Sequence, residues 1–271
     1  MSNAMVLFSG GPAEIDPLEL EIMQAAESEL TAYNYIPTRI KFPSGGMSVF
    51  SVDDTDTLKP PVKMIVAVAQ KVRAFWPDST TQGIPSLCQA PDSLFGIWRG
   101  SEENAAQVAL AAALPVQHPA LVHNGLAGDA YSCAACPLGQ WTDGQKPLCK
   151  ENRRLLVLVE GWSKPAVLTL PPTSLRIFDT YASARARVKG EAYFTCWTRV
   201  ELEQDVSAAG IKYSRVRLTA DAPLSREQKL AVLEIRRQYE ELVRGMEVTS
   251  DDYEVPGPTI NGQSADADIP F

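Results

Sequence analysis

Four of the five cysteines in this chain fall in one region, and their spacing predicts a bound metal ion. Cys133 and Cys136 are separated by two residues, which lets two thiolates grip one ion from a tight turn, and Cys149 follows after twelve more. Cys88 is the fourth ligand that we expect. A tetrahedral shell of four sulfurs leaves no open position for a substrate or an activated water. The cysteines therefore predict one structural Zn²⁺ per chain and no catalysis by it.

Two other uses of these residues remain open at this point. Cys133 and Cys136 could form a redox dithiol, although such a pair does not call for two further cysteines. His118 or His123 could replace Cys88 in a shell of three sulfurs and one nitrogen. Cys88 is favoured because prolines on both sides place it in a loop.

The composition indicates a globular protein in a reducing compartment. The chain has 271 residues and is 45% apolar, which is enough for a substantial core. We set aside residues 1–4 as a remnant of an expression tag and find no signal peptide after them. Thiols in a chain without a secretion signal are more often metal ligands than disulfides, so we expect a cytoplasmic location. The apolar stretch 105–122 is interrupted by polar residues and prolines, which predicts a partly helical insertion and no membrane partner.

The net charge of -8 is unevenly distributed along the chain, and this affects whether nucleic acid is a plausible partner. An acidic chain is a poor match for phosphates, which need clustered lysine and arginine. Residues 245–271, however, contain six acids and no Lys or Arg, so the rest of the chain has 27 acids against 25 bases. This polar tail has no apolar periodicity, and we expect it to be disordered.

The apolar periodicity predicts a mostly β protein with flanking helices, of the α+β class. The clearest helix signal is Ser225, which opens a capping box with Gln228, and Gly190 should end an earlier helix. Cys196 lies on the apolar face of its strand and should be buried. The expected elements are a short helix or arm at 17–33, two strands within 35–52, a strand at 62–76, a hairpin of 154–162 with 165–170, a helix at 173–189, strands at 193–202 and 211–219, and a helix at 226–244.

The cysteine block carries a family resemblance. It comprises Cys133-Ala-Ala-Cys-Pro137, Gln140-Trp141, Lys146-Pro-Leu-Cys-Lys150 and Arg153-Arg-Leu-Leu-Val-Leu158. With Arg73–Trp76 before it and Thr173-Ser-Leu175 and Thr198-Arg199 after it, the block resembles single-stranded DNA-binding proteins of phages and mobile elements. The resemblance covers roughly residues 35–220. It departs in a short segment at 141–144 and in an apparent insertion at 105–123.

The resemblance implies a fold and a function. The implied fold is an OB-type barrel at 35–244 with a zinc-ribbon-like insertion at about 83–150, between an N-terminal arm at 1–34 and the acidic tail at 245–271. The implied function is to bind and protect single-stranded DNA, without strong sequence preference, during replication or recombination.

The end of the chain carries a second resemblance. Residues 266–271, Asp-Ala-Asp-Ile-Pro-Phe, are similar to the acidic tip of bacterial single-stranded DNA-binding proteins, which recruits replication and repair partners. An apolar pocket rimmed with basic residues would accept the Phe271 ring and carboxylate, while aspartates steer the approach. The expected partner-binding residues are Asp266, Asp268, Ile269, Pro270 and Phe271.

Single strands are bound by aromatic faces that stack on bases beside cations that follow the phosphates. Trp197 is the strongest stacking candidate, because it alternates onto the polar side of its strand. The expected DNA-binding residues are Arg39, Lys41, Lys71, Arg73, Trp76, Arg153, Arg154, Tyr193, Trp197, Arg199, Lys212, Tyr213, Arg215 and Arg217. We find no phosphate-cradling glycine loop, paired carboxylates or histidine-assisted nucleophile, so we do not expect an enzyme. The alternative is an adaptor that zinc stabilises and that docks partners without touching DNA.

Overall fold

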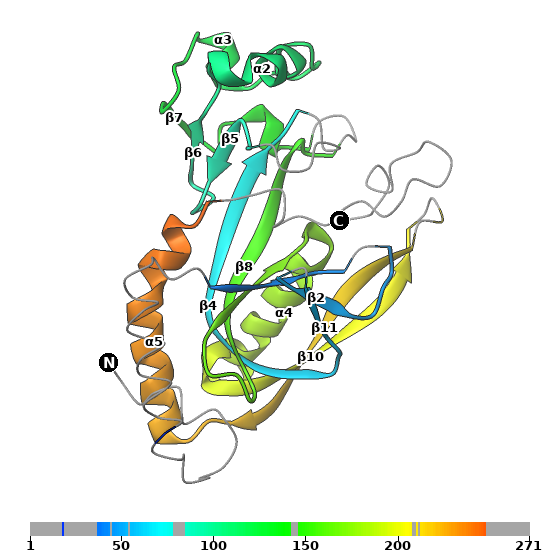
Figure 1. Ribbon diagram of the computed structural model, residues 1–271, viewed down its shortest axis with the longest axis vertical. Coiled ribbons are helices and arrows are strands. Elements are labelled where there is room, and N and C mark those ends of the chain that lie inside the picture. Colours follow the sequence, from blue (N-terminus) through cyan, green and yellow to red (C-terminus); the bar gives the residue numbers. More distant parts are fainter. Residues whose placement is uncertain are drawn as a thin grey trace.

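The computed structural model describes residues 18, 37–43, 45–53, 55–77, 85–141, 146–207, 210 and 212–247 (Figure 1). Apart from Leu18, the expected arm at 17–33 lies outside the described residues. So do the tail from 248 onward and its partner-binding tip.

One branched sheet organises the described chain. Its main path runs β3-β2-β1-β9-β8-β4-β5-β6-β7, and the β10–β11 hairpin joins it at β4. β1 pairs in parallel with β9, and the other pairs are antiparallel. The bounds are β1 Thr38–Lys41, β2 Phe50–Val52, β3 Asp56–Leu58, β4 Val62–Phe75, β5 Cys88–Ala90, β6 Phe95–Trp98, β7 Ala130–Ser132, β8 Cys149–Val159, β9 Ala166–Leu170, β10 Cys196–Val206 and β11 Lys212–Pro223.

The pairs within the described chain form an open sheet, not a closed barrel. The cause lies in β4, which pairs with β8 along one edge over most of its length. On its other edge β4 meets β10 at Val62–Met64 and β5 at Arg73–Phe75. Because one long strand serves two separate partners, the sheet forks and its ends do not meet.

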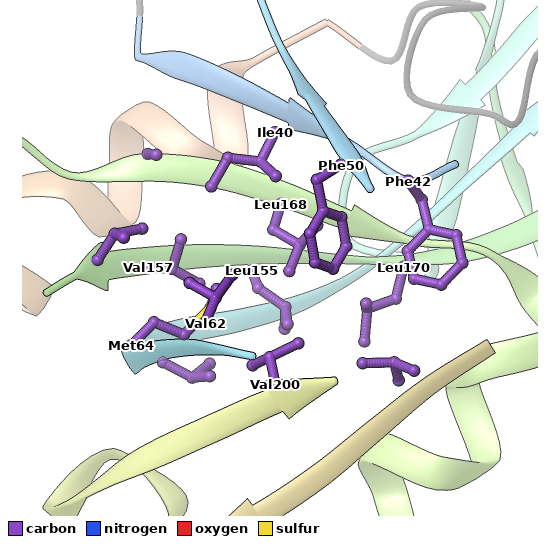
Figure 2. Close-up of a cluster of buried hydrophobic side chains, with 14 of the residues drawn as sticks. Ile40, Phe42, Phe50, Val62, Met64, Leu155, Val157, Leu168, Leu170 and Val200 are labelled. Atoms are coloured by element: carbon purple, nitrogen blue, oxygen red, sulfur yellow. The ribbon is translucent and has the colours of Figure 1, made fainter. Parts of the chain in front are cut away.

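Two helices cover opposite faces of the β4–β8 region (Figure 1). Alternate residues of β8 face opposite ways, so Leu155 and Val157 pack in the cluster that holds Phe178 of α4 (Pro172–Lys189). Leu156 and Leu158 pack against α5 (Arg226–Gly245). Figure 2 shows part of the α4-side cluster, with Ile40 and Phe50 above Leu155 and Val157. Burial on both faces explains why residues 64–69 of β4 and 155–159 of β8 are apolar without alternation.

Most elements expected from the sequence are confirmed. β4, the β8–β9 hairpin and the β10–β11 pair all form, α4 ends at Gly190 with φ +63°, and the Ser225 Oγ accepts the Gln228 amide at 3.2 Å at the start of α5. The strand expected at 193–202 begins later, at Cys196, because residues 193–195 form a 3₁₀ turn. β3, β5, β6 and β7 were missed, because three or four residues carry too little periodicity to be recognised. The loop expected around Cys88 is wrong for that reason, since Cys88 is the first residue of β5.

Residues 85–149, which we call the cysteine lobe, extend from the upper ends of β4 and β8 (Figure 1). This lobe contains β5 to β7 and the short helices α2 (Ala105–Ala112) and α3 (Pro119–Val122). Its small core includes Leu87 and Trp98, which cluster with Phe75 at the end of β4. Among the described helices, none is both long and apolar enough to cross a membrane.

Candidate functional site

The sheet register brings the distant cysteines together. Phe75 in β4 pairs with Cys88 on one side and with Cys149 on the other. Cys133 and Cys136 follow β7 in a tight turn, in which the Cys136 amide donates to the Cys133 carbonyl at 3.3 Å. All four cysteines line one small cavity of about 10 Å³.

The four thiols that line this cavity are the donor set that a small metal ion would need. A Cβ added to Gly96 would lie 2.6 Å from the Cys88 Sγ and 3.8 Å from the Cys133 Sγ, so only glycine leaves room for the sulfurs. Among the described residues, no group of three or more Cys, His, Asp or Glu side chains is arranged closely enough to hold a metal ion. The shared cavity shows which thiols could converge, and four sulfurs are the set typical of structural zinc.

Burial and the neighbouring sulfurs control the charge of the thiols. Burial raises the pKa of Cys88 to about 12, and Cys133 and Cys136 add to that rise. Burial also raises the pKa of Cys149 well above its ordinary value, with contributions from the other cysteines. Thiols in this setting hold their protons at neutral pH, so a cation must replace those protons when it binds.

The two histidines differ in their relation to the cavity. His118 lines it, but its ring stacks on Trp98 with centroids 4.7 Å apart, and its Nδ1 accepts the Ala120 amide at 3.1 Å. Burial lowers the pKa of His118 to about 4, so the ring is neutral at pH 7. His123 is exposed at the end of α3 and does not line the cavity. The arrangement supports Cys88 as the fourth ligand.

A groove of about 820 Å³ lies beside this cavity, between α4 and the segments on either side of residues 142–145. Its cationic side chains are Arg73, Lys150, Arg176 and Arg187, and its acids are Glu151 and Asp179. Arg176 and Arg187 are exposed, and neither forms an ion pair with another described residue. The excess of cations over acids makes this groove a place for an anionic ligand.

Apolar surface accompanies those charges. Trp141 is 58% exposed and lines the groove, and Val188 of α4, which also lines it, is 80% exposed. An exposed indole beside several cations is the combination that single-stranded nucleic acid requires.

Sequence analysis missed most of this groove, apart from Arg73. The available signal was the polar stripe Arg176, Thr180, Ser183 and Arg187, whose steps of four, three and four residues place all four on one face of α4. Local patterns gave no sign that Trp141 faces this stripe, because the two segments meet only in the tertiary fold.

Three of the expected DNA-binding residues lie on the α4 side of the sheet. Arg73 lines the groove. Lys71 pairs with Glu151 at 3.0 Å, and Arg153 pairs with Asp179 while its guanidinium lies 5.3 Å from the centre of the Phe178 ring. Trp76 is half-buried against Val72 and Ala74, and Arg39 and Lys41 are half-buried on β1.

Several other candidates are corrected by the structure, because they are buried. Arg154 is fully buried and donates to the carbonyls of Val243, Met246 and Glu247 at the end of α5. Trp197, our strongest stacking candidate, is 7% exposed. The reason is α5, which covers the polar side of β10 and packs Val232 and Ile235 into the same cluster as Trp197.

The two tyrosines are corrected as well. The Tyr193 ring packs edge-on against the rings of Phe178 and Phe194. Tyr213 is buried, and its hydroxyl donates to the Asp205 carboxylate at 3.2 Å. The buried Tyr213 ring presents no face to a base, and the half-buried Tyr193 ring is held in a cluster of three aromatic rings.

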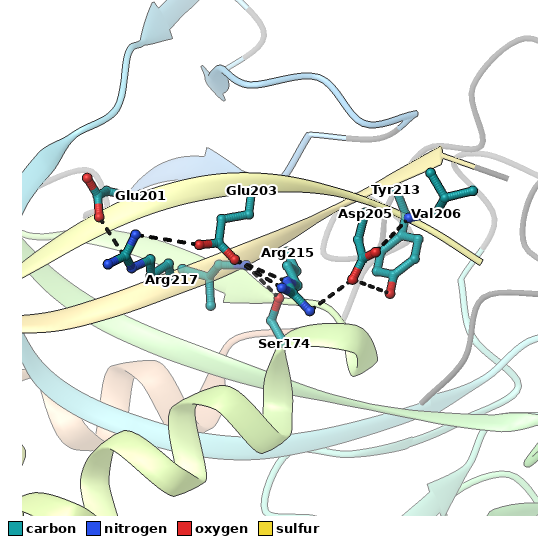
Figure 3. Close-up of polar contacts among 9 residues, drawn as sticks. Ser174, Glu201, Glu203, Asp205, Val206, Tyr213, Arg215 and Arg217 are labelled. Atoms are coloured by element: carbon teal, nitrogen blue, oxygen red, sulfur yellow. Dashed lines mark hydrogen bonds and ion pairs between the residues drawn. The ribbon is translucent and has the colours of Figure 1, made fainter. Parts of the chain in front are cut away.

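In the β10–β11 hairpin, Arg199 and Arg217 are exposed and Arg215 is half-buried, and acids pair with the arginines (Figure 3). Arg215 contacts Asp205 at 2.8 Å and Glu203 at 3.2 Å, and Arg217 lies 3.8 Å from Glu201. Arg199 also contacts Glu201, so three cations alternate with three acids on one face. A phosphate would have to displace those acids, which makes this ladder a weaker site than the groove. Lys212 is exposed at the start of β11.

The chain resembles no known protein closely enough to place it in a family. No match was found among protein-family models, curated proteins or solved structures.

Proposed function

We propose that this chain binds single-stranded DNA, without strong sequence preference, in the groove between α4 and the cysteine lobe. The observation that carries this proposal is the exposed Trp141 beside Arg73, Lys150, Arg176 and Arg187 in one groove. A base stacked on an aromatic side chain contributes ~1 to 3 kcal/mol, and the cations would follow the phosphates. The groove requires unpaired bases, because Trp141 must reach a free base face.

The proposal includes a structural Zn²⁺ held by Cys88, Cys133, Cys136 and Cys149. Cys149 lines both the cavity and the groove, so an ion in the cavity would fix part of the groove wall. Binding of zinc by four thiolates contributes on the order of 10 kcal/mol to folding in small metal domains. The cysteine lobe, whose own core is small, would depend on that contribution.

Three further parts of the proposal rest on the resemblances in the sequence. They are an origin in a phage or mobile element, a role in replication or recombination, and recruitment of partners by Phe271 and the acidic tip. The proposal does not require an OB-type barrel, because the groove is built from α4, β8 and the cysteine lobe.

Fluorescence anisotropy with labelled oligo-dT at low salt tests the binding. The logarithm of affinity should fall against the logarithm of salt concentration with a slope of about -2.8 if all four cations contact phosphates. Duplex DNA of equal length should bind more weakly. If neither oligo-dT nor duplex binds at low salt, DNA binding is excluded and an adaptor becomes the better explanation.

Matched variants locate the site. Arg176→Ala with Arg187→Ala should reduce the magnitude of the salt slope by about 1.4, and Trp141→Ala should weaken binding about tenfold. Arg215→Ala with Arg217→Ala, on the ladder, is the control with the same loss of charge and should change binding less. A larger effect from the ladder variant would place the site on the β10–β11 hairpin.

A further inference from the structure

Arg73 stands between the two cavities and lines both of them. Its Nε and Nη2 donate to the Glu151 Oε2 at 2.9 and 2.7 Å. A Cβ added to Gly139 would lie 2.7 Å from the Arg73 Nη1, so the guanidinium rests against the turn that follows Cys136. β4 therefore delivers one cation to the wall between the cysteine cavity and the groove.

The position of Arg73 matters because a metal ion bound by the four cysteines would form a negatively charged centre. A divalent ion with four thiolates carries two net negative charges, and burial makes uncompensated charge costly. Among the described residues that line the cysteine cavity, Arg73 is the one with a charged side chain at neutral pH. Burial raises the pKa of Cys133 and Cys136, and the Arg73 charge works against that rise.

Glu151 competes for the same guanidinium. It lies on the groove side of Arg73 and also pairs with Lys71. The Glu151 carboxylate raises the pKa of Cys133, whereas the Arg73 charge lowers it, so the two side chains act on this sulfur in opposite directions. The Arg73–Glu151 pair thus determines the electrostatic potential at the sulfurs.

We propose that Arg73 is the countercharge of the metal centre, that it strengthens Zn²⁺ binding by the four cysteines, and that Glu151 tempers this effect. This inference rests on the proposed metal site. Since Arg73 also lines the groove, it screens bound phosphates from the negative centre. Outer-sphere partners of metal ligands commonly change metal affinity 10–100-fold.

Titration of the full-length, reduced, metal-free chain with Co²⁺ tests the inference, with the visible absorption reporting a tetrahedral sulfur shell. Competition of Zn²⁺ against a chromophoric chelator then gives the affinity. Arg73→Gln should weaken Zn²⁺ binding about tenfold, and Arg73→Lys should retain most of it. Glu151→Gln should strengthen binding, because it releases Arg73 toward the sulfurs.

The expected changes in Zn²⁺ affinity have opposite signs for Arg73→Gln and Glu151→Gln, which separates a countercharge from a purely structural role. Both neutral variants break the same ion pair, so a purely structural effect would shift Zn²⁺ affinity in the same direction in both. Equal affinities, or a shared direction, would overturn the inference while leaving the metal site in place. A wild-type chain that binds neither ion would overturn the inference and the proposed metal site together. Arg73→Lys keeps the test valid if Arg73→Gln folds poorly.

Discussion

At the scale of single residues, Arg154 is a basic side chain that stabilises the fold and does not face solvent. It is fully buried, and its guanidinium donates to three carbonyls at the end of α5, at 3.0 to 3.2 Å. The last carbonyls of a helix lack partners within the helix, so a cation here satisfies them and opposes the negative end of the dipole. Arg154 therefore fixes the end of α5 and the two residues that follow it.

Arg154→Met should lower the free energy of unfolding by about 3 kcal/mol, because buried carbonyls lose charge-assisted hydrogen bonds. Urea unfolding followed by circular dichroism measures this loss. Arg215→Met, on the exposed ladder, is the matched control and should cost less than about 1 kcal/mol. Equal unfolding midpoints for the two variants would show that Arg154 does not hold α5.

His118 makes the stability of the cysteine lobe depend on pH. Burial lowers the pKa of His118 from 6.5 to about 4, so its contribution is present above pH 6.5 and is lost as pH falls toward 4. His118→Asn keeps a side-chain acceptor for the Ala120 amide but cannot titrate. Between pH 7 and 4.5 the wild-type protein should lose roughly 2.5 kcal/mol more than this variant.

Chemical unfolding at both pH values, in the presence of a chelator, measures that difference without a contribution from bound metal. His123→Asn, at the exposed end of α3, is the control and should retain the wild-type pH dependence. A His118→Asn variant with the wild-type pH dependence would show that the buried ring does not titrate on unfolding.

At the scale of elements, α4 closes an edge of the sheet. β11 pairs only with β10 in the described chain, and an open strand edge invites pairing with other chains. Ser174 in the first turn of α4 is fully buried, and its Oγ accepts the Val216 amide at 3.2 Å (Figure 3). One helix therefore supplies both a groove wall and a partner for a strand edge.

Ser174→Ala should destabilise the protein by roughly 1 to 3 kcal/mol, because the buried Val216 amide loses its partner. Thermal unfolding compares this variant with Ser183→Ala, a half-buried position on the same helix, which should be nearly neutral. Hydrogen exchange at Val216 should become faster in Ser174→Ala. Unchanged exchange would show that another group satisfies this amide.

At the scale of the whole molecule, the acidic tail is tethered at a known point. The Glu247 carbonyl accepts from Arg154, and its carboxylate pairs with Arg99 of the cysteine lobe. The remaining five acids, between residues 248 and 271, follow this anchor. If the groove binds DNA as proposed, repulsion between these acids and the phosphates should weaken that binding, and salt should screen the repulsion.

Removing residues 249–271 should therefore tighten binding of oligo-dT at low salt, and the gain should shrink as salt is added. This boundary keeps Glu247 in place for Arg154 and Arg99. A full-length variant with the five acids changed to Asn or Gln should reproduce the gain and separates charge from length. Affinity unchanged by either variant would rule out competition by the tail.

The sequence alone determined the elements whose signals are local. Examples are the capping box at Ser225, the left-handed Gly190 and the apolar runs of β4 and β8. Each depends on residues that are close together in sequence, so the helix ends and the strands could be predicted. The spacing of Cys133 and Cys136 likewise indicated that these two thiols lie in one turn, whereas the sheet register brings Cys88 and Cys149 to the same cavity.

Only the tertiary structure decided which cations and rings remain at the surface. Trp197 alternates onto the polar side of β10, but α5, which follows later in the chain, covers that side. The groove depends on Trp141 facing the Arg176–Arg187 stripe, a meeting of segments far apart in sequence. Periodicity reports how a segment divides its own side chains between two faces, whereas burial depends on which other segment packs there.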